Sequence, residues 1–204
     1  LASEGYLSGP GGISIGPEGD VFFADIWNQR IRVIREATGS IDTVAGNGAR
    51  ANGADDGPAL EAPLGSPHDV SVDSEGRIVV TDTRHGRLRR VDCSGVIRSV
   101  AGTVFQWDGG EGGHASATSL FHVQAVTHDV NGNVFVGDAI GRIRRIDAET
   151  GVATTVAGVG IQGYNGDGGP AIEARIGSPT AIVVDDKGAL YFTDSAYHVV
   201  RNID

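Results

Sequence analysis

The chain contains no methionine and only one cysteine among its 204 residues. Because Cys93 is alone, a disulfide within the chain is excluded, and cysteine gives no indication of the compartment. No apolar run approaches the length of a membrane-spanning helix. The chain begins at Leu1 without a signal peptide, and since a starting methionine is missing we expect it to be a segment of a larger chain or assembly.

Positive charge is also scarce: 16 Lys and Arg stand against 26 Asp and Glu, a net charge of −10 at pH 7. Acidic side chains gather in long glycine-rich segments, at Asp55, Asp56, Asp108, Glu111 and Asp167. An acidic surface repels phosphate groups, so we expect no nucleic acid partner. The 32 glycines indicate turn-dense structure, and a hydrophobic content of 40% is enough for a core.

The chain repeats itself every 56 residues. Three independent markers share this period, and each recurs in three copies: Asp82, Asp138 and Asp194; Gly46, Gly102 and Gly158; Ala59, Ala115 and Ala171. Asp25 lies 57 residues before Asp82 and adds a fourth copy of the first marker. A fixed period of this length indicates a repeat architecture, in which each copy is one supersecondary unit that packs on its neighbours.

The second copy shows what one repeat contains. Residues 69–72 alternate polar and apolar side chains, and residues 78–81 are a continuous apolar run. Residues 87–91 and 96–100 follow, with a turn between them. Four short β-rich runs in each repeat predict the four antiparallel strands of a β-propeller blade. Before the first strand, residues 57–62 and 169–174 place Pro ahead of good helix formers, which predicts a single helical turn.

We therefore predict an all-β fold with one propeller region over residues 1–204. Its blades are expected at about residues 7–46, 64–102, 120–158 and 176–204, and the last blade lacks its outer strand. The third copy diverges, because His114 and Val123 replace prolines and its Asp138–Arg142 connector is one residue shorter. Four blades alone would expose apolar blade faces, so we expect further blades that complete a ring.

Two motifs carry a resemblance to a known family. The first comprises Gly166-Asp167-Gly168-Gly169-Pro170-Ala171 and the later Leu190-Tyr191-Phe192-Thr193-Asp194; the second is Asp25-Ile26-Trp27-Asn28-Gln29-Arg30-Ile31-Arg32. With them the chain resembles an NHL-repeat β-propeller over its whole length, which implies about six blades in the ring. The resemblance is specific for fold and not for function, because such propellers include protein-binding platforms, RNA binders, sensor domains and occasional lyases. It slightly favours a secreted, periplasmic or organelle-lumenal placement, although the sequence does not identify the compartment.

The long loops indicate which face binds. Each lead-in loop, the segment that precedes the first strand of a blade, is long: residues 47–66, 103–122 and 159–178. In a propeller the connector between the second and third strands lies on the same face, and long loops on a rigid scaffold are usual binding sites. Aromatic and arginine side chains make good anchors. The candidate binding residues are Trp27, Arg84, His85, Trp107, Tyr164, Tyr197 and His198. Alternatively, Trp107 and Tyr164 fold back and hold their own loops.

The family resemblance also implies an enzymatic alternative, a metal-dependent lyase or hydrolase with three histidines around a zinc ion in the central channel. The position that follows the pre-strand proline reads Gly11, His68, Gln124 and Thr180, so only one of the four copies has a histidine. We therefore expect His68, Gln124 and Thr180 to line the channel, with His68 a weak metal candidate. No catalytic residue and no cofactor is predicted; zinc and calcium are the alternatives. The likeliest function is a non-catalytic scaffold that binds a partner protein or ligand.

Two recurring charged positions are interpreted as structural. The Asp that ends each second strand is expected to accept backbone N–H bonds as a turn cap. The third strands are rich in arginine, at Arg30 and Arg32; Arg87, Arg89 and Arg90; and Arg142, Arg144 and Arg145. Their regular recurrence predicts pairing with the recurring Asp and not a stripe for nucleic acid.

Overall fold

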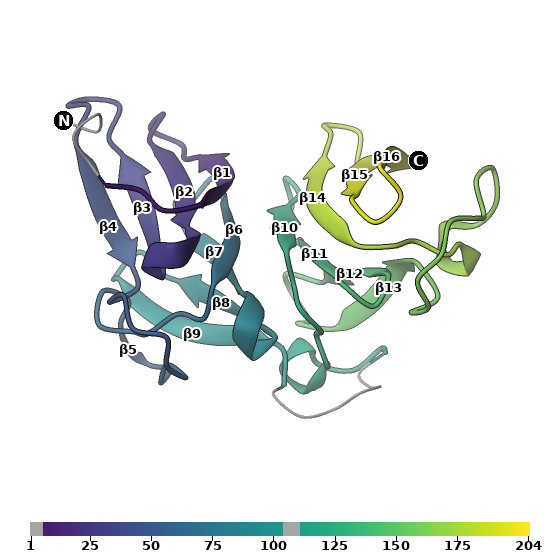
Figure 1. Cartoon of the computed structure of the whole chain (residues 1–204), viewed down its shortest axis with the longest axis horizontal. Helices are drawn as coiled ribbons and strands as arrows, with labels where there is room; N and C mark the ends of the chain where they lie inside the picture. The colour runs from purple at the N-terminus through teal and green to yellow at the C-terminus, as the bar shows by residue number, and fades with distance from the viewer. Residues whose placement is uncertain (1–5, 104–110) are drawn as a thin grey trace. The chain divides into compact units, whose positions relative to one another are not determined.

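The computed structural model describes residues 6–103 and 111–204, and the chain divides into two compact units, Leu1–Val100 and Ala101–Asp204. Both are built of short antiparallel strands (Figure 1). Within the described residues no helix has the length and apolar character needed to cross a membrane. The predicted all-β fold of four propeller blades is confirmed, while the number of blades in a complete ring stays a prediction.

The first unit holds two blades. In blade 1, the strands β1 to β4 pair in chain order; they span Pro10–Ile15, Val21–Asp25, Arg30–Ile34 and Ile41–Ala45. In blade 2, the strands β6 to β9 do the same; they span Pro67–Val72, Ile78–Asp82, Arg87–Val91 and Val96–Ala101. A two-residue strand that the sequence did not predict, β5 (Gly57–Pro58), pairs with β9 on the outer edge of blade 2.

The second unit repeats this plan. In blade 3, β10 to β13 span Ala125–His128, Val134–Asp138, Arg142–Ile146 and Ala153–Ala157. Blade 4 has three strands, β14 to β16, at Pro179–Val184, Leu190–Asp194 and Val199–Ile203. Its sheet follows the order β14-β15-β16, so β16 is the edge strand, which agrees with the expectation that the outer strand is missing.

Short 3₁₀ turns occupy several connectors. The helical turn predicted over residues 169–174 is present as η5 (Ala171–Glu173), directly after Pro170. In blade 3 the matching turn is η4 (Ala115–Ala117), where the His114 ring accepts the Ser116 N–H in place of a proline start. The prediction for residues 57–62 is wrong in part: Gly57 and Pro58 are drawn into β5 by pairing with β9, and only a turn closed by the Glu61 N–H to Pro58 O bond of 3.0 Å follows. The connectors after β2 and β7 also form turns, η2 (Ile26–Asn28) and η3 (Thr83–His85).

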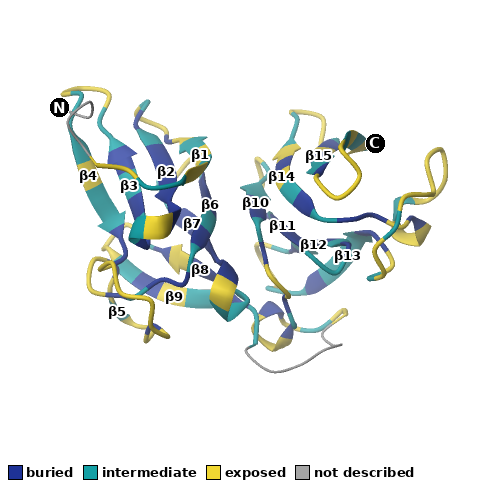
Figure 2. Ribbon diagram, viewed as in Figure 1, coloured by how far each residue is buried: buried dark blue, intermediate teal, exposed yellow. Residues whose placement is uncertain are grey.

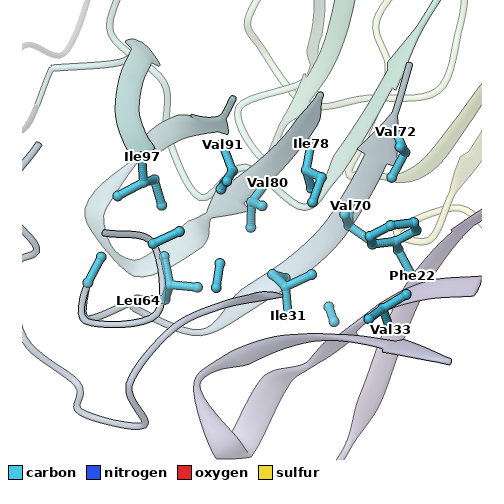
Figure 3. Close-up of a cluster of buried hydrophobic side chains, with 14 of the residues drawn as sticks. Phe22, Ile31, Val33, Leu64, Val70, Val72, Ile78, Val80, Val91 and Ile97 are labelled. Carbon is cyan, nitrogen blue, oxygen red and sulfur yellow. The ribbon is translucent and has the colours of Figure 1, made fainter. Parts of the chain in front are cut away.

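Alternating side chains of the strands form the cores (Figure 2). In the first unit, β1 and β2 pack on β6, and residues such as Ile31, Val33 and Val80 are fully buried (Figure 3). Leu64, in the loop ahead of blade 2, joins the same cluster. In the second unit β10 packs on β14 around Phe135 and Phe192. Each blade thus buries its apolar face against the next blade of its own unit.

The recurring Gly and Ala mark the joint between one blade and the next lead-in loop. The Gly46 N–H donates to Ala59 O at 2.9 Å, and the counterpart pairs Gly102–Ala115 and Gly158–Ala171 measure 3.2 and 3.0 Å. Gly46 has φ of +92°, and a Cβ there would lie 2.3 Å from Gln29 O. The backbone conformation and the close approach both require glycine at this position.

The recurring Asp ties each lead-in loop to its own blade. The N–H groups of Ser8, Gly65 and Gly177 donate to Asp25, Asp82 and Asp194 at 2.9, 2.9 and 2.6 Å, always across 17 residues. This confirms the interpretation as caps. Asp138 is the exception, because its Oδ1 accepts only the Arg142 N–H at 3.2 Å among the printed bonds, and its buried Oδ2 has no hydrogen-bond partner among the described residues.

Candidate functional site

Lead-in loops and second-to-third-strand connectors lie together in the described blades. The Trp27 N–H donates to Ser8 O at 3.0 Å in blade 1, and the Arg84 N–H donates to Gly65 O at 2.9 Å in blade 2. In blade 4, a Cβ at Gly177 would lie 2.8 Å from the Tyr197 ring. Each blade therefore presents one loop face, which we define as its lead-in loop together with the connector between its second and third strands.

Trp27 is the most prominent side chain on the loop face of blade 1. Its indole is 60% exposed, although one edge packs so closely on Gly9 that a Cβ there would lie 2.2 Å from the ring. The Arg50 guanidinium, from the lead-in loop of blade 2, lies 5.8 Å from the ring centroid. A cation over an indole is attracted by the negative face of the ring. The ring is thus held in place while most of its surface stays available.

A second aromatic group lies on the loop face of blade 4. Tyr164 and Tyr197 stack with ring centroids 5.7 Å apart and an interplanar angle of 23°, and Arg201 lies 5.5 Å from the Tyr164 centroid. Tyr164 therefore holds its own loop, as the alternative interpretation expected. It nevertheless remains 52% exposed, and Tyr197 remains 39% exposed. The pair is both fixed and accessible.

The other predicted binding residues differ in their freedom. Arg84 is exposed, but His85 is mostly buried and its Nδ1 lies 2.7 Å from Asp82 Oδ1, so it supports the turn. His198 is exposed with φ of +57°, at the position where blades 2 and 3 have Gly86 and Gly141. Trp107 and Asp108 lie outside the described residues. No binding role of these residues is tested by the geometry, and each stays a prediction.

The third-strand arginines pair as the sequence predicted. Arg32 Nη1 lies 3.5 Å from Asp25 Oδ2, and Arg89 Nη1 lies 3.9 Å from Asp82 Oδ2, in each case within one blade. Arg89 has no exposed side-chain surface. Burial lowers the pKa of the Arg89 guanidinium, while the charge of Asp55 raises it.

Sequence reasoning missed the second partner of these arginines. Asp55, Glu111 and Asp167 recur at the 56-residue period in the lead-in loops, and each pairs with the arginine at the centre of its third strand. The pairs are Asp55–Arg89 at 2.9 Å, Glu111–Arg144 at 3.9 Å, and Asp167–Arg201. Asp56 pairs with Arg98 at 2.6 Å. The expectation that these carboxylates give the loops a free acidic surface is therefore wrong, because their charges are partnered by arginine. The spacing of 56 was the available signal.

The expected channel-lining residues are all half-buried and make polar contacts. The His68 N–H donates to Thr81 Oγ1 at 3.1 Å. Gln124 Oε1 accepts from Ser178 Oγ at 3.2 Å, and Thr180 Oγ1 lies 3.0 Å from Thr193 Oγ1. Across residues 6–103 and 111–204 no three His, Cys, Asp or Glu side chains gather as metal ligands. Lining of a channel stays a prediction.

Comparison with known sequences bears on the repeat. Residues 64–91 match the family described as NHL repeat. Teneurin-3 from Danio rerio is 31% identical over 184 residues, which cover 80% of this chain and 6% of that protein. NHL repeat-containing protein 2 from Gallus gallus is 35% identical over 126 residues, which cover 60% of this chain and 17% of that protein. The chain thus matches only a small part of the length of these relatives.

Comparison with solved structures bears on the fold. A structural genomics protein of unknown function from Bacteroides thetaiotaomicron superimposes with a TM-score of 0.76 at 18% identity, over 95% of this chain and 46% of that one. A streptogramin B lyase gives 0.62 at 16% identity over 98% and 55%. A chain of a nidogen/laminin complex gives 0.67 at 16% identity over 97% and 61%. At such identities the likeness shows the fold alone.

Proposed function

Because the chain belongs to the NHL-repeat β-propellers, we propose that it is a non-catalytic binding module that takes a partner protein on its loop faces. The observation that carries the proposal is the pair of fixed but exposed aromatic groups, Trp27 with Arg50 and Tyr164 with Tyr197. Aromatic and arginine side chains dominate the energetic centres of protein interfaces.

The fixed position of these side chains also matters energetically. A side chain that is already held loses less conformational freedom when a partner covers it, so more of the contact energy appears as affinity. Gly9 and Arg50 hold Trp27, while Tyr164 and Arg201 support Tyr197. The loops themselves are fastened to the third strands by Asp55–Arg89 and Asp167–Arg201. The loop faces are therefore rigid platforms.

The structural neighbours are compatible with either class of function. One belongs to a nidogen/laminin complex, in which a propeller-like chain has a protein partner, and another is a streptogramin B lyase. The binding proposal is preferred because its anchors are on the surface of this chain, whereas the enzymatic alternative has His68 as its one candidate ligand at the matched positions.

The proposal is tested by site-specific photo-crosslinking in the native source of the protein. A photoreactive residue is placed next to Trp27, at Gln29 on one variant and Asn28 on another, and the captured proteins are compared in the wild-type and Trp27→Ala/Tyr197→Ala backgrounds. Val130→Ala is the matched control, because Val130 is 84% exposed in the β10–β11 turn and is not on a loop face. A partner captured by wild type and Val130→Ala but lost from the double variant is expected. A set of captured proteins that the double variant leaves unchanged contradicts the proposal.

A further inference from the structure

The open edge of blade 4 borders a hollow of about 270 Å³. One wall is the whole of β16 (Val199–Ile203), and the opposite wall is the lead-in segment that contains Gly168, Gly169 and Ala171. Its floor includes Phe192 and Ile176, which belong to the apolar core. We call this space the blade 4 slot. Backbone groups thus face it from both sides along the direction of a strand.

Blade 2 shows what fills the matching space. There β9 lies between β8 on one side and β5, in the lead-in segment, on the other. Ile97 of β9 is fully buried in one cluster with Ala59 and Leu64 (Figure 3). The residues 112 positions after Ala59 and Leu64 are Ala171 and Ile176, which line the blade 4 slot.

Blade 3 has the same arrangement. β13 pairs with β12 on one side. On the other side the Gly112 N–H donates to Ala153 O at 2.9 Å, and the Ala115 N–H donates to Gly151 O at 2.8 Å. Gly168 and Ala171 are the counterparts of Gly112 and Ala115. The blade 4 slot therefore has both pairing partners of a strand, and blades 2 and 3 show that a strand fits between them.

The strands that fill the outer position of the other blades share one sequence pattern. They read Ile41-Asp42-Thr43-Val44-Ala45-Gly46, Ile97-Arg98-Ser99-Val100-Ala101-Gly102 and Ala153-Thr154-Thr155-Val156-Ala157-Gly158. An apolar residue comes first, Ser or Thr is third, and Val-Ala-Gly follows. This pattern is the chemistry that the slot selects.

The third position is read by the carboxylate of the lead-in loop. The N–H and hydroxyl of Ser99 donate to Asp55 Oδ1 at 2.9 and 3.1 Å. The N–H and hydroxyl of Thr155 donate to Glu111 at 2.8 and 2.6 Å. In blade 4 the counterpart is Asp167, whose side chain is 63% exposed while Arg201 holds its Oδ1. A Ser or Thr in the blade 4 slot would receive the same pair of hydrogen bonds.

We propose that the blade 4 slot binds an extended segment of a partner protein as a fourth strand, antiparallel to β16, with the sequence apolar-x-Ser/Thr-Val-Ala-Gly. The register follows from blade 3, where Ala153 is opposite Ile146 and Thr155 is opposite Arg144. The apolar residue of the segment lies opposite Ile203, and its Ser or Thr lies opposite Arg201. Backbone bonds supply the affinity in such strand addition, and the side-chain positions supply the specificity. This site goes beyond the loop-face proposal, since it uses neither Trp27 nor Tyr197.

The test uses the chain's own β9 sequence as the probe. A fluorescent peptide Gly-Val-Ile-Arg-Ser-Val-Ala-Gly, residues 95–102, is titrated with the 204-residue chain and followed by anisotropy. Saturable binding is expected. The peptides with Ile97→Asp and Ser99→Val are expected to bind at least roughly tenfold more weakly, because a charge enters the apolar slot or the bonds to Asp167 are lost. Changes in the peptide cannot unfold the protein.

Variants of the protein provide the second arm. Asp167→Asn is expected to weaken the peptide by roughly tenfold, as loss of a charge-assisted hydrogen bond does. Asp186→Asn is the control of equal charge on an exposed turn and is expected to bind like wild type. Trp27→Ala/Tyr197→Ala should also bind the peptide normally, so a failure of the loop-face proposal would be seen separately.

Three outcomes overturn the proposal. The first is no binding of the peptide, and the second is equal binding of the Ile97→Asp peptide. The third is a stable dimer of the chain in sedimentation that the peptide dissociates, because the occupant of the slot would then be a second copy of this chain and not a partner protein.

Discussion

The carboxylate of Asp55 lies 2.9 Å from Nη2 of Arg89, a side chain with no exposed surface. The same guanidinium donates to Ala54 O at 2.7 Å, so the arginine fastens the loop by its backbone as well as by its charge. Glu111 with Arg144 and Asp167 with Arg201 repeat the relationship at the 56-residue period. Each of these pairs joins a lead-in loop to the centre of a third strand.

Asp55→Asn should destabilise the chain by about 3 kcal/mol, because it leaves a buried guanidinium without its anionic partner. The neighbouring Asp56→Asn is the matched control: Asp56 and its partner Arg98 are 72% and 50% exposed, and such pairs contribute little. Urea unfolding followed by circular dichroism measures both. Equal midpoints for the two variants would show that the buried pair does not fasten the loop.

Gly46→Ala should destabilise the first unit more than Gly188→Ala does. The two glycines have φ of +92° and +91°, so both substitutions cost about 1–2 kcal/mol of backbone strain. Only at Gly46 does the new Cβ also meet a backbone oxygen, 2.3 Å away at Gln29, whereas Gly188 has open space. Thermal unfolding of both variants isolates the cost of the close approach. Equal losses would mean that the joint between the blades tolerates a side chain.

The period of 56 residues made the blades predictable because three markers recur at one spacing. The structure gives each a physical cause: Gly46 and Ala59 form the joint between blades, and Asp82 holds Gly65. The strand β5 could not be foreseen, since Gly57-Pro58 has no strand pattern and is extended only by pairing with β9. For the loop face, the sequence identified the exposed aromatics but not that Tyr164 stacks on Tyr197, because stacking depends on how the loop returns.

Asp138 shows how a diverged copy changes the chemistry of a recurring residue. Burial raises the pKa of its carboxyl from 3.8 to about 7, against the opposing charges of Arg144 and Arg142. In blades 2 and 4 a glycine N–H, from Gly65 or Gly177, donates to the Asp. Blade 3 has Phe121 at that position and a shorter connector, and no such bond from Phe121 is formed to compensate the burial.

The stability of the second unit should therefore fall as pH rises from about 4 to about 7. In that range the folded state keeps a proton on Asp138 that the unfolded state releases, so folding is opposed increasingly, by on the order of 4 kcal/mol in all. Asp138→Asn removes the titration, so its advantage over wild type should grow with pH and level off above about pH 7. Urea midpoints at pH 5 and pH 8 measure this growth. Asp186→Asn is the exposed control, and a pH-independent effect of Asp138→Asn would contradict the buried proton.

The claim that this propeller binds and does not catalyse is tested most directly by its metal content. The protein is purified without chelators and measured by elemental mass spectrometry, as wild type and as His68→Ala, with His198→Ala as the control for an exposed histidine. The account predicts no stoichiometric metal in any of the three. Stoichiometric zinc that His68→Ala loses and His198→Ala keeps would contradict it, and would move the functional site from the loop faces to the residue that His68 adjoins.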